Sequence, residues 1–345
     1  MRKALIAGLM GLLVIASTMG QAPKKVVITS LGPPYSRIGE KELAEFRAAA
    51  PKINLVVAED KAKMMAEVAD ADGIIGTINP EIIRAARKLR WVQVHSAGVE
   101  GVLTPEMKES AITLTNCKIV MGPEIADHAF ALLLSLTRDL YRIIPRRVKE
   151  EWPRDEYHPI ELLGKRAVII GVGGIGTNIA ARAKAFGMFV TGLDPREVVA
   201  PSPLIDRWSP PDRLDEVLPD ADVVFMAAPS TGQSAKMFGA RQFALMKPTA
   251  YFICVSRGRT YDIDALVQAI GSKKIAGAGV DVTDPTEPLP PGHPLWKFEN
   301  VIITPHIAGR SDGEHARYMA LFRENLRRFQ NDEPLINVVD KQKGY

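Results

Sequence analysis

Short apolar runs alternate with amphipathic segments along most of the chain. After Lys24, four runs have the length and the β-branched composition of buried strands. They are residues 26–29, 54–57, 73–76 and 91–94. Residues 41–49 and 81–89, which lie between these runs, repeat apolar side chains at helical spacing. Alternating strands and helices predict a parallel sheet with helices on both faces.

A long helical segment separates this series from a second one. Pro123 is tolerated at the first position of a helix, so we expect the helix to start there and to cover residues 124–144. Residues 149–159 are polar, contain prolines and are predicted to form a loop. A second series of strands and helices begins at Arg166 and continues to about Pro305.

The C-terminal part of the sequence returns to a helical pattern. Ser311 and Glu314 have the spacing of a capping box, which marks the start of a helix. The apolar residues that follow at intervals of three to four are Met319, Phe322, Leu326 and Phe329. We expect this apolar face to be buried against the first domain.

The N-terminal residues have the pattern of a secretory signal peptide. Arg2 and Lys3 precede the apolar stretch 4–16, and small residues follow it. The stretch is shorter than the roughly 20 residues that span a bilayer. We expect residues 1–22 to be a signal peptide cleaved after Gly20, or an N-terminal anchor, on a periplasmic or secreted protein. The alternative is a cytoplasmic protein that starts at Met19.

Composition narrows the range of functions. The 345 residues suffice for two domains, and 44 Lys and Arg face 40 Asp and Glu. These charges are interspersed, whereas nucleic-acid surfaces cluster their cations, so we expect no nucleic-acid partner. Cys117 and Cys254 are expected to be inert core residues, and we expect no metal.

The strongest motif follows the apolar strand at residues 166–170, which runs directly into the pattern Gly-x-Gly-x-x-Gly. In a dinucleotide site the first glycine makes a tight turn, the second admits the diphosphate and the third lets helix pack on strand. The helix predicted at residues 177–186 directs its N-terminal N–H groups at the phosphates. The loop residues expected to bind a cofactor are Gly171, Gly173, Gly174, Ile175 and Gly176.

Asp194 ends the next predicted strand, residues 188–193. A carboxylate there accepts hydrogen bonds from the adenosine ribose and repels a 2′-phosphate, which predicts NAD as the cofactor. Arg196 could accommodate a 2′-phosphate, so NADP stays open.

Three ionisable residues follow later strands of the second series. Arg257 comes after the apolar run 251–255, Glu287 after 278–282 and a short loop, and His306 after 301–303. Ligands of open α/β sheets bind beyond the carboxyl ends of the strands, so these residues lie where chemistry is expected.

With these motifs, the sequence resembles the D-isomer-specific 2-hydroxyacid dehydrogenases over about residues 24–331. The matching blocks are residues 171–176 with Asp194, 255–259 with Asp262, 279–289, and 304–309. The resemblance implies an α/β fold of two doubly wound parallel-sheet domains. A Rossmann NAD-binding domain, residues 123–307, would be inserted into a flavodoxin-like substrate domain formed by residues 23–122 and 308–345.

The resemblance also implies a role for each ionisable residue. Arg257 would bind the substrate carboxylate in bidentate fashion and polarise the 2-oxo group. His306 would act as general acid and base. Glu287 would tune His306 by favouring its protonated form, with Asp284 as a nearby competitor for that position. Further cofactor contacts are implied for Val255, Ser256, Asp281 and Gly309. Substrate-binding backbone groups are implied at Ala97, Gly98 and Val99.

The implied activity is hydride transfer between NAD(H) and a small 2-oxo or D-2-hydroxy acid, as in glyoxylate and hydroxypyruvate reductases. We expect a homodimer with the long helix of the cofactor domain at its interface. A non-catalytic NAD(H) sensor is one alternative. A formate dehydrogenase-type enzyme is another, although Glu287 argues against it, since that enzyme carries Gln there. Gly174 departs from the family, which often has a polar or basic residue at this position.

Overall fold

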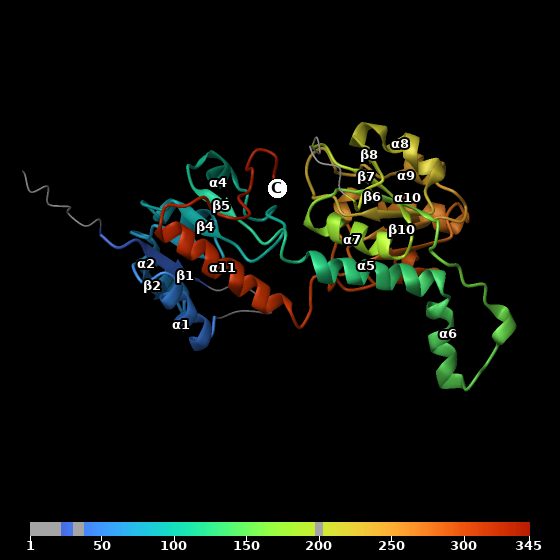
Figure 1. Ribbon diagram of the computed structural model, residues 1–345, viewed down its shortest axis with the longest axis horizontal. Coiled ribbons are helices and arrows are strands. Elements are labelled where there is room, and N and C mark those ends of the chain that lie inside the picture. Colours follow the sequence, from blue (N-terminus) through green and yellow to red (C-terminus); the bar gives the residue numbers. More distant parts are fainter. Residues whose placement is uncertain (1–21, 30–37, 197–202) are drawn as a thin grey trace, which may run out of the picture.

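The computed structural model describes residues 22–29, 38–196 and 203–345 (Figure 1). The predicted signal segment, apart from Ala22, lies outside the described residues. Two parallel sheets with flanking helices form two lobes joined by crossing segments, which confirms the predicted fold class.

The first sheet has five parallel strands in the order β2-β1-β3-β4-β5, which is the flavodoxin-like order. The strands are β1 (Lys25–Ile28), β2 (Asn54–Val57), β3 (Gly73–Ile75), β4 (Trp91–Gln93) and β5 (Thr113–Thr115). Its helices are α1 (Glu40–Ala49), α2 (Lys61–Val68), α3 (Pro80–Ala85) and α4 (Pro105–Glu109). The side chains of Asp60, Asn79 and Thr104 cap the N-termini of α2, α3 and α4, because each accepts a hydrogen bond from a backbone N–H of the first turn.

The second sheet has seven parallel strands in the order β12-β11-β10-β9-β6-β7-β8. The strands are β6 (Arg166–Ile170), β7 (Phe189–Leu193), β8 (Arg207–Ser209), β9 (Val223–Met226), β10 (Tyr251–Cys254), β11 (Gly277–Val280) and β12 (Val301–Ile303). Its helices include α7 (Gly174–Ala185), α8 (Leu214–Val217), α9 (Ala240–Leu245) and α10 (Ile263–Gly271). Strand order reverses between β6 and β9, and dinucleotides bind at such a switch point.

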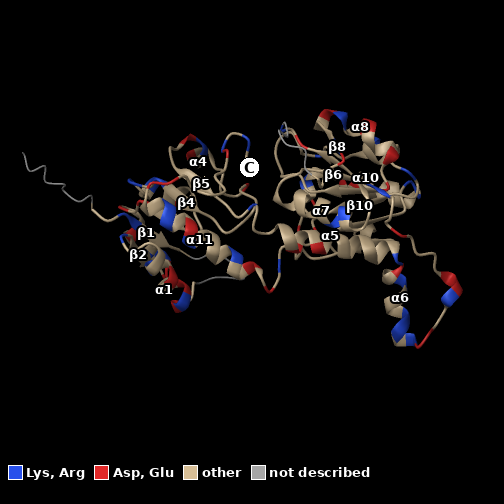
Figure 2. Ribbon diagram, viewed as in Figure 1, with Lys and Arg blue, Asp and Glu red and all other residues tan. Residues whose placement is uncertain are grey.

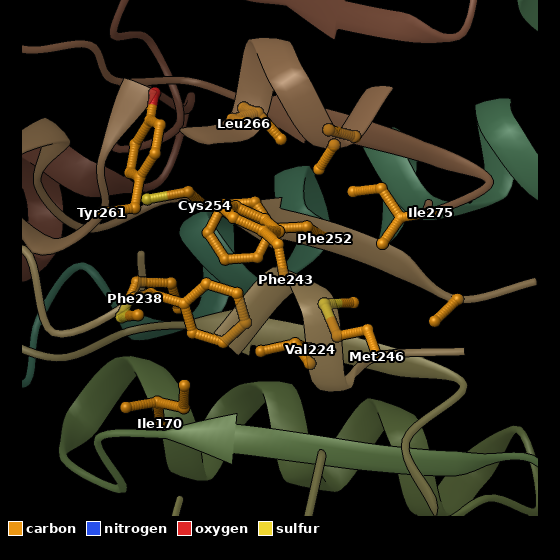
Figure 3. Packing of buried hydrophobic residues seen from close by; sticks show 14 of the residues in the cluster. Ile170, Val224, Phe238, Phe243, Met246, Phe252, Cys254, Tyr261, Leu266 and Ile275 are labelled. Atoms are coloured by element: carbon orange, nitrogen blue, oxygen red, sulfur yellow. The ribbon is translucent and has the colours of Figure 1, made fainter. Parts of the chain in front are cut away.

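One face of the second sheet carries an aromatic core (Figure 3). Phe238, Phe243 and Phe252 contact one another, with ring centroids 4.8 to 5.2 Å apart, and Tyr261 meets Phe252 edge-on. Cys254 lies in the same cluster and is fully buried, which raises the pKa of its thiol to about 11. Buried thiols of this kind are unreactive, so Cys254 acts as a core residue.

Two helices connect the lobes. α5 (Gly122–Thr137) packs against α7, β10 and β11 of the second lobe. α11 (Glu314–Gln330) returns to the first lobe and packs against α1. Phe322 of α11 is fully buried, and the ring of Phe329 lies 4.9 Å from that of Trp91 in β4. The apolar face predicted for the C-terminal helix is therefore buried against the first sheet.

Two predicted helix features are wrong. The helix expected over residues 124–144 is broken: α5 ends at Thr137, Asp139 adopts a left-handed backbone with φ of 57°, and α6 (Leu140–Arg146) begins after it. The capping box of Ser311 and Glu314 does not form, because Gly313 rather than Ser311 caps α11. The hydroxyl of Ser311 instead accepts a hydrogen bond from Arg317.

Residues of positive and negative charge alternate along the ribbon of both lobes (Figure 2). Within the described ranges, no helix combines the length and the apolar character needed to cross a bilayer. Nor do the described residues include a group of three or more His, Cys, Asp or Glu side chains placed to hold a metal ion.

Candidate active site

The three predicted catalytic residues lie beyond the carboxyl ends of three adjacent strands. Arg257 follows β10, Glu287 follows β11 and His306 follows β12, and these strands are neighbours in the sheet. Residues far apart along the chain are therefore brought to one edge of the second sheet.

Glu287 and His306 form a direct pair. Nδ1 of His306 lies 2.7 Å from Oε2 of Glu287, and Oε1 of Glu287 accepts a hydrogen bond of 2.9 Å from the backbone N–H of Thr283. Half of the His306 side chain is exposed, so its ring is accessible to a ligand. Glu287, and not its neighbour Asp284, is the carboxylate that pairs with His306. Because one carboxylate oxygen is held by the backbone and the other by the imidazole, the ring orientation is fixed.

Asp281 anchors the loop that carries His306. Its buried carboxylate accepts hydrogen bonds from the Thr304 hydroxyl at 2.6 Å and from the backbone N–H groups of Ile307 at 3.0 Å and Ala308 at 2.9 Å. The backbone N–H of His306 donates to the Asp281 carbonyl at 2.9 Å. The resemblance implied a cofactor contact for Asp281; sequence reasoning did not foresee this second role in placing His306.

His128 adds to the same network from α5. Its Nε2 lies 2.8 Å from the hydroxyl of Thr304 and 3.5 Å from Oδ1 of Asp281. The long helix is thus connected by side-chain contacts to the loop after β12. This position gives His128 a structural role.

Arg257 reaches from the second lobe to the loop Ala97-Gly98-Val99 of the first. A Cβ atom placed on Gly98 would collide with Nη2 and Cζ of Arg257, so only glycine lets the guanidinium approach this closely. The carbonyls of the loop are tied down: Ser96 donates to the Gly98 carbonyl at 2.6 Å and Asn116 to the Ala97 carbonyl at 2.6 Å. The predicted carboxylate-binding loop and the predicted carboxylate-binding side chain therefore meet.

Glu100 was missed by sequence reasoning. Its Oε1 lies 3.2 Å from Nε of Arg257, so a carboxylate of the protein pairs with the arginine predicted to bind a substrate carboxylate. Both side chains are partly exposed. The available signal was the position of Glu100 directly after the Ala97-Gly98-Val99 loop.

The glycine-rich turn has the shape expected of a diphosphate site. Gly171 has φ of +90°, and a Cβ there would meet the backbone of Ala228; a Cβ on Gly176 would meet the carbonyl of Gly171. Space around Gly173 is open, since nothing lies within 4 Å of an added Cβ. α7 begins directly after Gly173, and no side chain caps it, so its first N–H groups are available to an anion. Ile175 lies in this first turn.

Gly174 is explained by a backbone that crosses above it. An added Cβ would lie 2.7 Å from the carbonyl oxygen of Lys118 and 2.9 Å from Cα of Ile119. A larger residue is excluded, which accounts for the departure from the family pattern.

Lys118 was also missed from the sequence; burial and the nearby Arg196 lower the pKa of its ammonium. A lysine of the first lobe therefore lies close to the predicted cofactor site.

Asp194 is buried at the end of β7 and is held by Arg196. Nε of Arg196 donates to Oδ1 at 2.6 Å and Nη2 donates to Oδ2 at 2.7 Å, while the backbone N–H of Val172 donates to Oδ2 at 2.9 Å. Burial opposes ionisation of Asp194, but these hydrogen bonds outweigh it and lower the pKa of the carboxyl. The carboxylate therefore stays charged beside the glycine-rich turn.

The remaining predicted cofactor contacts lie beside the catalytic residues. Val255 and Ser256 are buried between β10 and Arg257, and the Ser256 hydroxyl oxygen has no hydrogen-bond partner within the described ranges. Gly309 packs against Met121 in the crossing segment. An unpaired buried hydroxyl and an open glycine turn along the same sheet edge fit a bound dinucleotide.

Comparison with known proteins agrees with this geometry. Residues 130–308 match a family described as D-isomer specific 2-hydroxyacid dehydrogenase, NAD binding domain. The chain is 33% identical over 311 residues to the glyoxylate reductase of Korarchaeum cryptofilum, a match that covers 87% of this chain and 90% of that protein.

Solved structures with the same fold include two enzymes in complex with small molecules. The NADPH-dependent glyoxylate/hydroxypyruvate reductase of Sinorhizobium meliloti has a TM-score of 0.74 and 26% identity, and the match covers 92% of this chain and 98% of that one. The D-lactate dehydrogenase of Aquifex aeolicus, solved with NAD and lactic acid, has a TM-score of 0.70 and 26% identity, covering 89% and 96%. The chain therefore belongs to the D-isomer specific 2-hydroxyacid dehydrogenase family of NAD(P)-dependent oxidoreductases.

Proposed function

We propose that this protein reduces a short 2-oxo acid of the glyoxylate or hydroxypyruvate type to the D-2-hydroxy acid, with NADH as preferred cofactor. The observation that carries the proposal is the hydrogen bond between His306 and Glu287, which follow β12 and β11, at the same sheet edge as Arg257, which follows the next strand, β10. A general acid and a carboxylate-binding cation are the two groups that 2-oxo acid reduction requires of the protein.

His306 is the proposed proton donor. A dinucleotide held by the glycine-rich turn and Asp194 would supply the hydride from its nicotinamide. The imidazolium of His306 gives its proton to the substrate oxygen that becomes the hydroxyl. Glu287 holds the opposite ring nitrogen at 2.7 Å, which directs the other nitrogen at the substrate and stabilises the charged ring. In the oxidative direction the neutral ring accepts the proton.

Arg257 is the proposed substrate anchor. Its planar guanidinium matches a carboxylate in two-point geometry, and the backbone N–H groups of Ala97, Gly98 and Val99 would donate to the same anion. The close approach of Arg257 to Gly98 supports this arrangement. The anchor places the 2-oxo carbon at the edge of the sheet where His306 lies.

The preference for NADH over NADPH rests on Asp194. Its carboxylate is buried and ionised at the position where the adenosine ribose is expected, so a 2′-phosphate would meet a negative charge. The guanidinium of Arg196 already donates two hydrogen bonds to Asp194 and one, from Nη2, to the Val172 carbonyl at 3.0 Å, which limits its use for a phosphate.

A second copy of this chain is the proposed partner. α6 and the segment after it expose large apolar side chains: Ile144 is 61%, Val148 79% and Trp152 92% exposed. Figure 1 shows α6 projecting from the second lobe, next to the end of α5. Apolar side chains on a projecting arm are typical of an interface between subunits.

Light scattering of the wild type should give the mass of a dimer. The double variant Val148→Asp/Trp152→Asp should shift toward the monomer.

The activity is tested by NADH oxidation with a panel of 2-oxo acids: glyoxylate, hydroxypyruvate, pyruvate and bulkier homologues. We expect turnover with at least one short acid and a loss of about 10²- to 10⁴-fold in His306→Ala. Arg257→Ala should lose activity mainly through a higher KM.

The alternatives give different results in the same assay. An NAD(H) sensor would bind NADH tightly but turn over none of the acids. A formate dehydrogenase-type enzyme would reduce NAD with formate and leave the 2-oxo acids untouched. Wild-type rates in both single variants would also overturn the proposal.

A further inference from the structure

The guanidinium of Arg257 is already engaged by the protein. Nε pairs with Glu100 at 3.2 Å, Nη1 donates to the carbonyl of Ser256 at 2.8 Å, and Nη2 lies against Gly98. Of these neighbours only Glu100 carries a charge. A substrate carboxylate that binds Arg257 at two points through Nε must therefore displace the carboxylate of Glu100.

On the basis of the function proposed above, we propose that Glu100 is a specificity-determining residue that restricts the substrate to 2-oxo acids with a single negative charge. Glu100 belongs to the first lobe and Arg257 to the second. The ion pair therefore joins the two parts of the proposed substrate site, the loop Ala97-Gly98-Val99 and the guanidinium of Arg257. Glu100 is two residues from Gly98, and an atom added to Gly98 would also meet its carboxylate.

The charge balance of the site gives the direction of the effect. Arg257 and Glu100 together are neutral. A monoanion exchanges with Glu100 one for one on the guanidinium, and the displaced carboxylate, 40% exposed, turns to solvent. A dianion brings a second negative charge to a site where Arg257 is then already paired and His306 already faces Glu287, while Glu100 remains on the same loop. Like charges at close range repel even when partly solvated, so the dianion binds more weakly.

Oxamate and oxalate separate this effect from shape, because they are nearly isosteric and carry one and two negative charges at neutral pH. Their binding to the full chain in the presence of NADH is measured by titration calorimetry. We expect the wild type to bind oxamate about fivefold or more tighter than oxalate, the order of effect for one partly solvated charge.

Glu100→Gln removes the charge and keeps the size of the side chain. It should bind both anions more tightly, with the larger gain for oxalate, so that the preference falls to about twofold or less. Glu106→Gln is the matched control: Glu106 also pairs with an arginine, Arg84, but on the exposed side of α4. It should behave as the wild type. Pyruvate and oxaloacetate give the same comparison as a change in the ratio of their kcat/KM values.

Several results would overturn the proposal. Weaker binding of both anions in Glu100→Gln would mean that Glu100 only positions Arg257. An unchanged preference, or no binding of either anion by the wild type, would remove the specificity role. A protein that discriminates the anions but reduces no 2-oxo acid would contradict the proposed function and leave the role of Glu100 intact. If the protein reduces 2-oxo acids but Glu100→Gln keeps the wild-type preference, the proposed function stands and the role of Glu100 is contradicted.

Discussion

Nδ1 of His306 and Oε2 of Glu287 lie 2.7 Å apart although 19 residues separate them along the chain. The distance is short because β11 and β12 are adjacent, the carbonyl of Asp281 accepts from the backbone N–H of His306, and the Asp281 carboxylate binds the two residues after His306. The same arrangement leaves half of the imidazole exposed. His306 is thus held by its neighbours on one side and open to a ligand on the other.

Replacing Glu287 by Gln should lower kcat about 10²-fold while the KM for NADH stays within about twofold. The amide can still hydrogen-bond to the ring, but it no longer stabilises the imidazolium that donates the proton. Steady-state kinetics of 2-oxo acid reduction give both numbers. Glu299→Gln, a change at an exposed carboxylate of the same lobe, is the control. An unchanged kcat in Glu287→Gln would show that the pair has no part in proton transfer.

Replacing Arg257 by Lys should raise the KM for the 2-oxo acid by about tenfold or more, because an ammonium cannot bind a carboxylate at two points. The KM for NADH should stay nearly constant. Arg259→Lys, two residues away and exposed, should leave both constants as in the wild type. Equal effects of the two substitutions would contradict a specific role for Arg257.

Replacing Asp194 by Ala should lower the ratio of kcat/KM for NADH to that for NADPH by about tenfold or more. The substitution removes the buried negative charge and the two side-chain hydrogen bonds that Arg196 donates to it, so the guanidinium becomes more available to a 2′-phosphate. Parallel kinetics with both cofactors measure the ratio. Asp212→Ala, an exposed change in the same lobe, should not move it. A ratio that stays constant in Asp194→Ala would place cofactor selection elsewhere.

His95 should make the protein less stable in mild acid. Burial lowers the pKa of His95 below its ordinary value of 6.5, so the unfolded chain binds the proton more readily than the folded one. The free energy of unfolding therefore falls as the pH drops below about 6.5 and stops falling only below the folded pKa.

Urea unfolding at pH 7.5 and at pH 5.5 measures the difference. His95→Gln should lose less stability between the two pH values than the wild type. The exposed His158 serves as control, because His158→Gln should leave the difference unchanged. A larger acid loss in His95→Gln would contradict the assignment.

Most of the fold was predictable because its signals are local. The strands at Lys25–Ile28 and Arg166–Ile170 are apolar runs. The turn after β6 is recognisable because its glycines are close together in the sequence. The break at Asp139 was not predictable, since the apolar spacing continues through it and only the left-handed backbone of one residue divides α5 from α6.

Site residues that belong to a sequence motif were predictable. Site residues whose role depends on a contact between the two lobes were not. Arg257, Glu287 and His306 each follow a strand, and strand order places them together. Glu100 directly follows the predicted carboxylate-binding loop, but its pairing with Arg257 and the contact of Lys118 with Gly174 both join the two lobes, and no local pattern specifies such contacts. The hydrogen bonds of Asp281 to the loop after β12 likewise depend on tertiary structure.

The return of α11 to the first lobe constrains how the chain folds during synthesis. The core around Val26 is completed by Phe322 and Phe329, which leave the ribosome only after every strand of the second sheet has been made. The second lobe can thus fold first, as a unit. During this time the apolar surface of Phe46 and Trp91 in the first lobe is not yet covered by α11. A nascent chain of this protein spends most of its translation time with an incomplete first lobe, and this interval is when it most needs protection from aggregation.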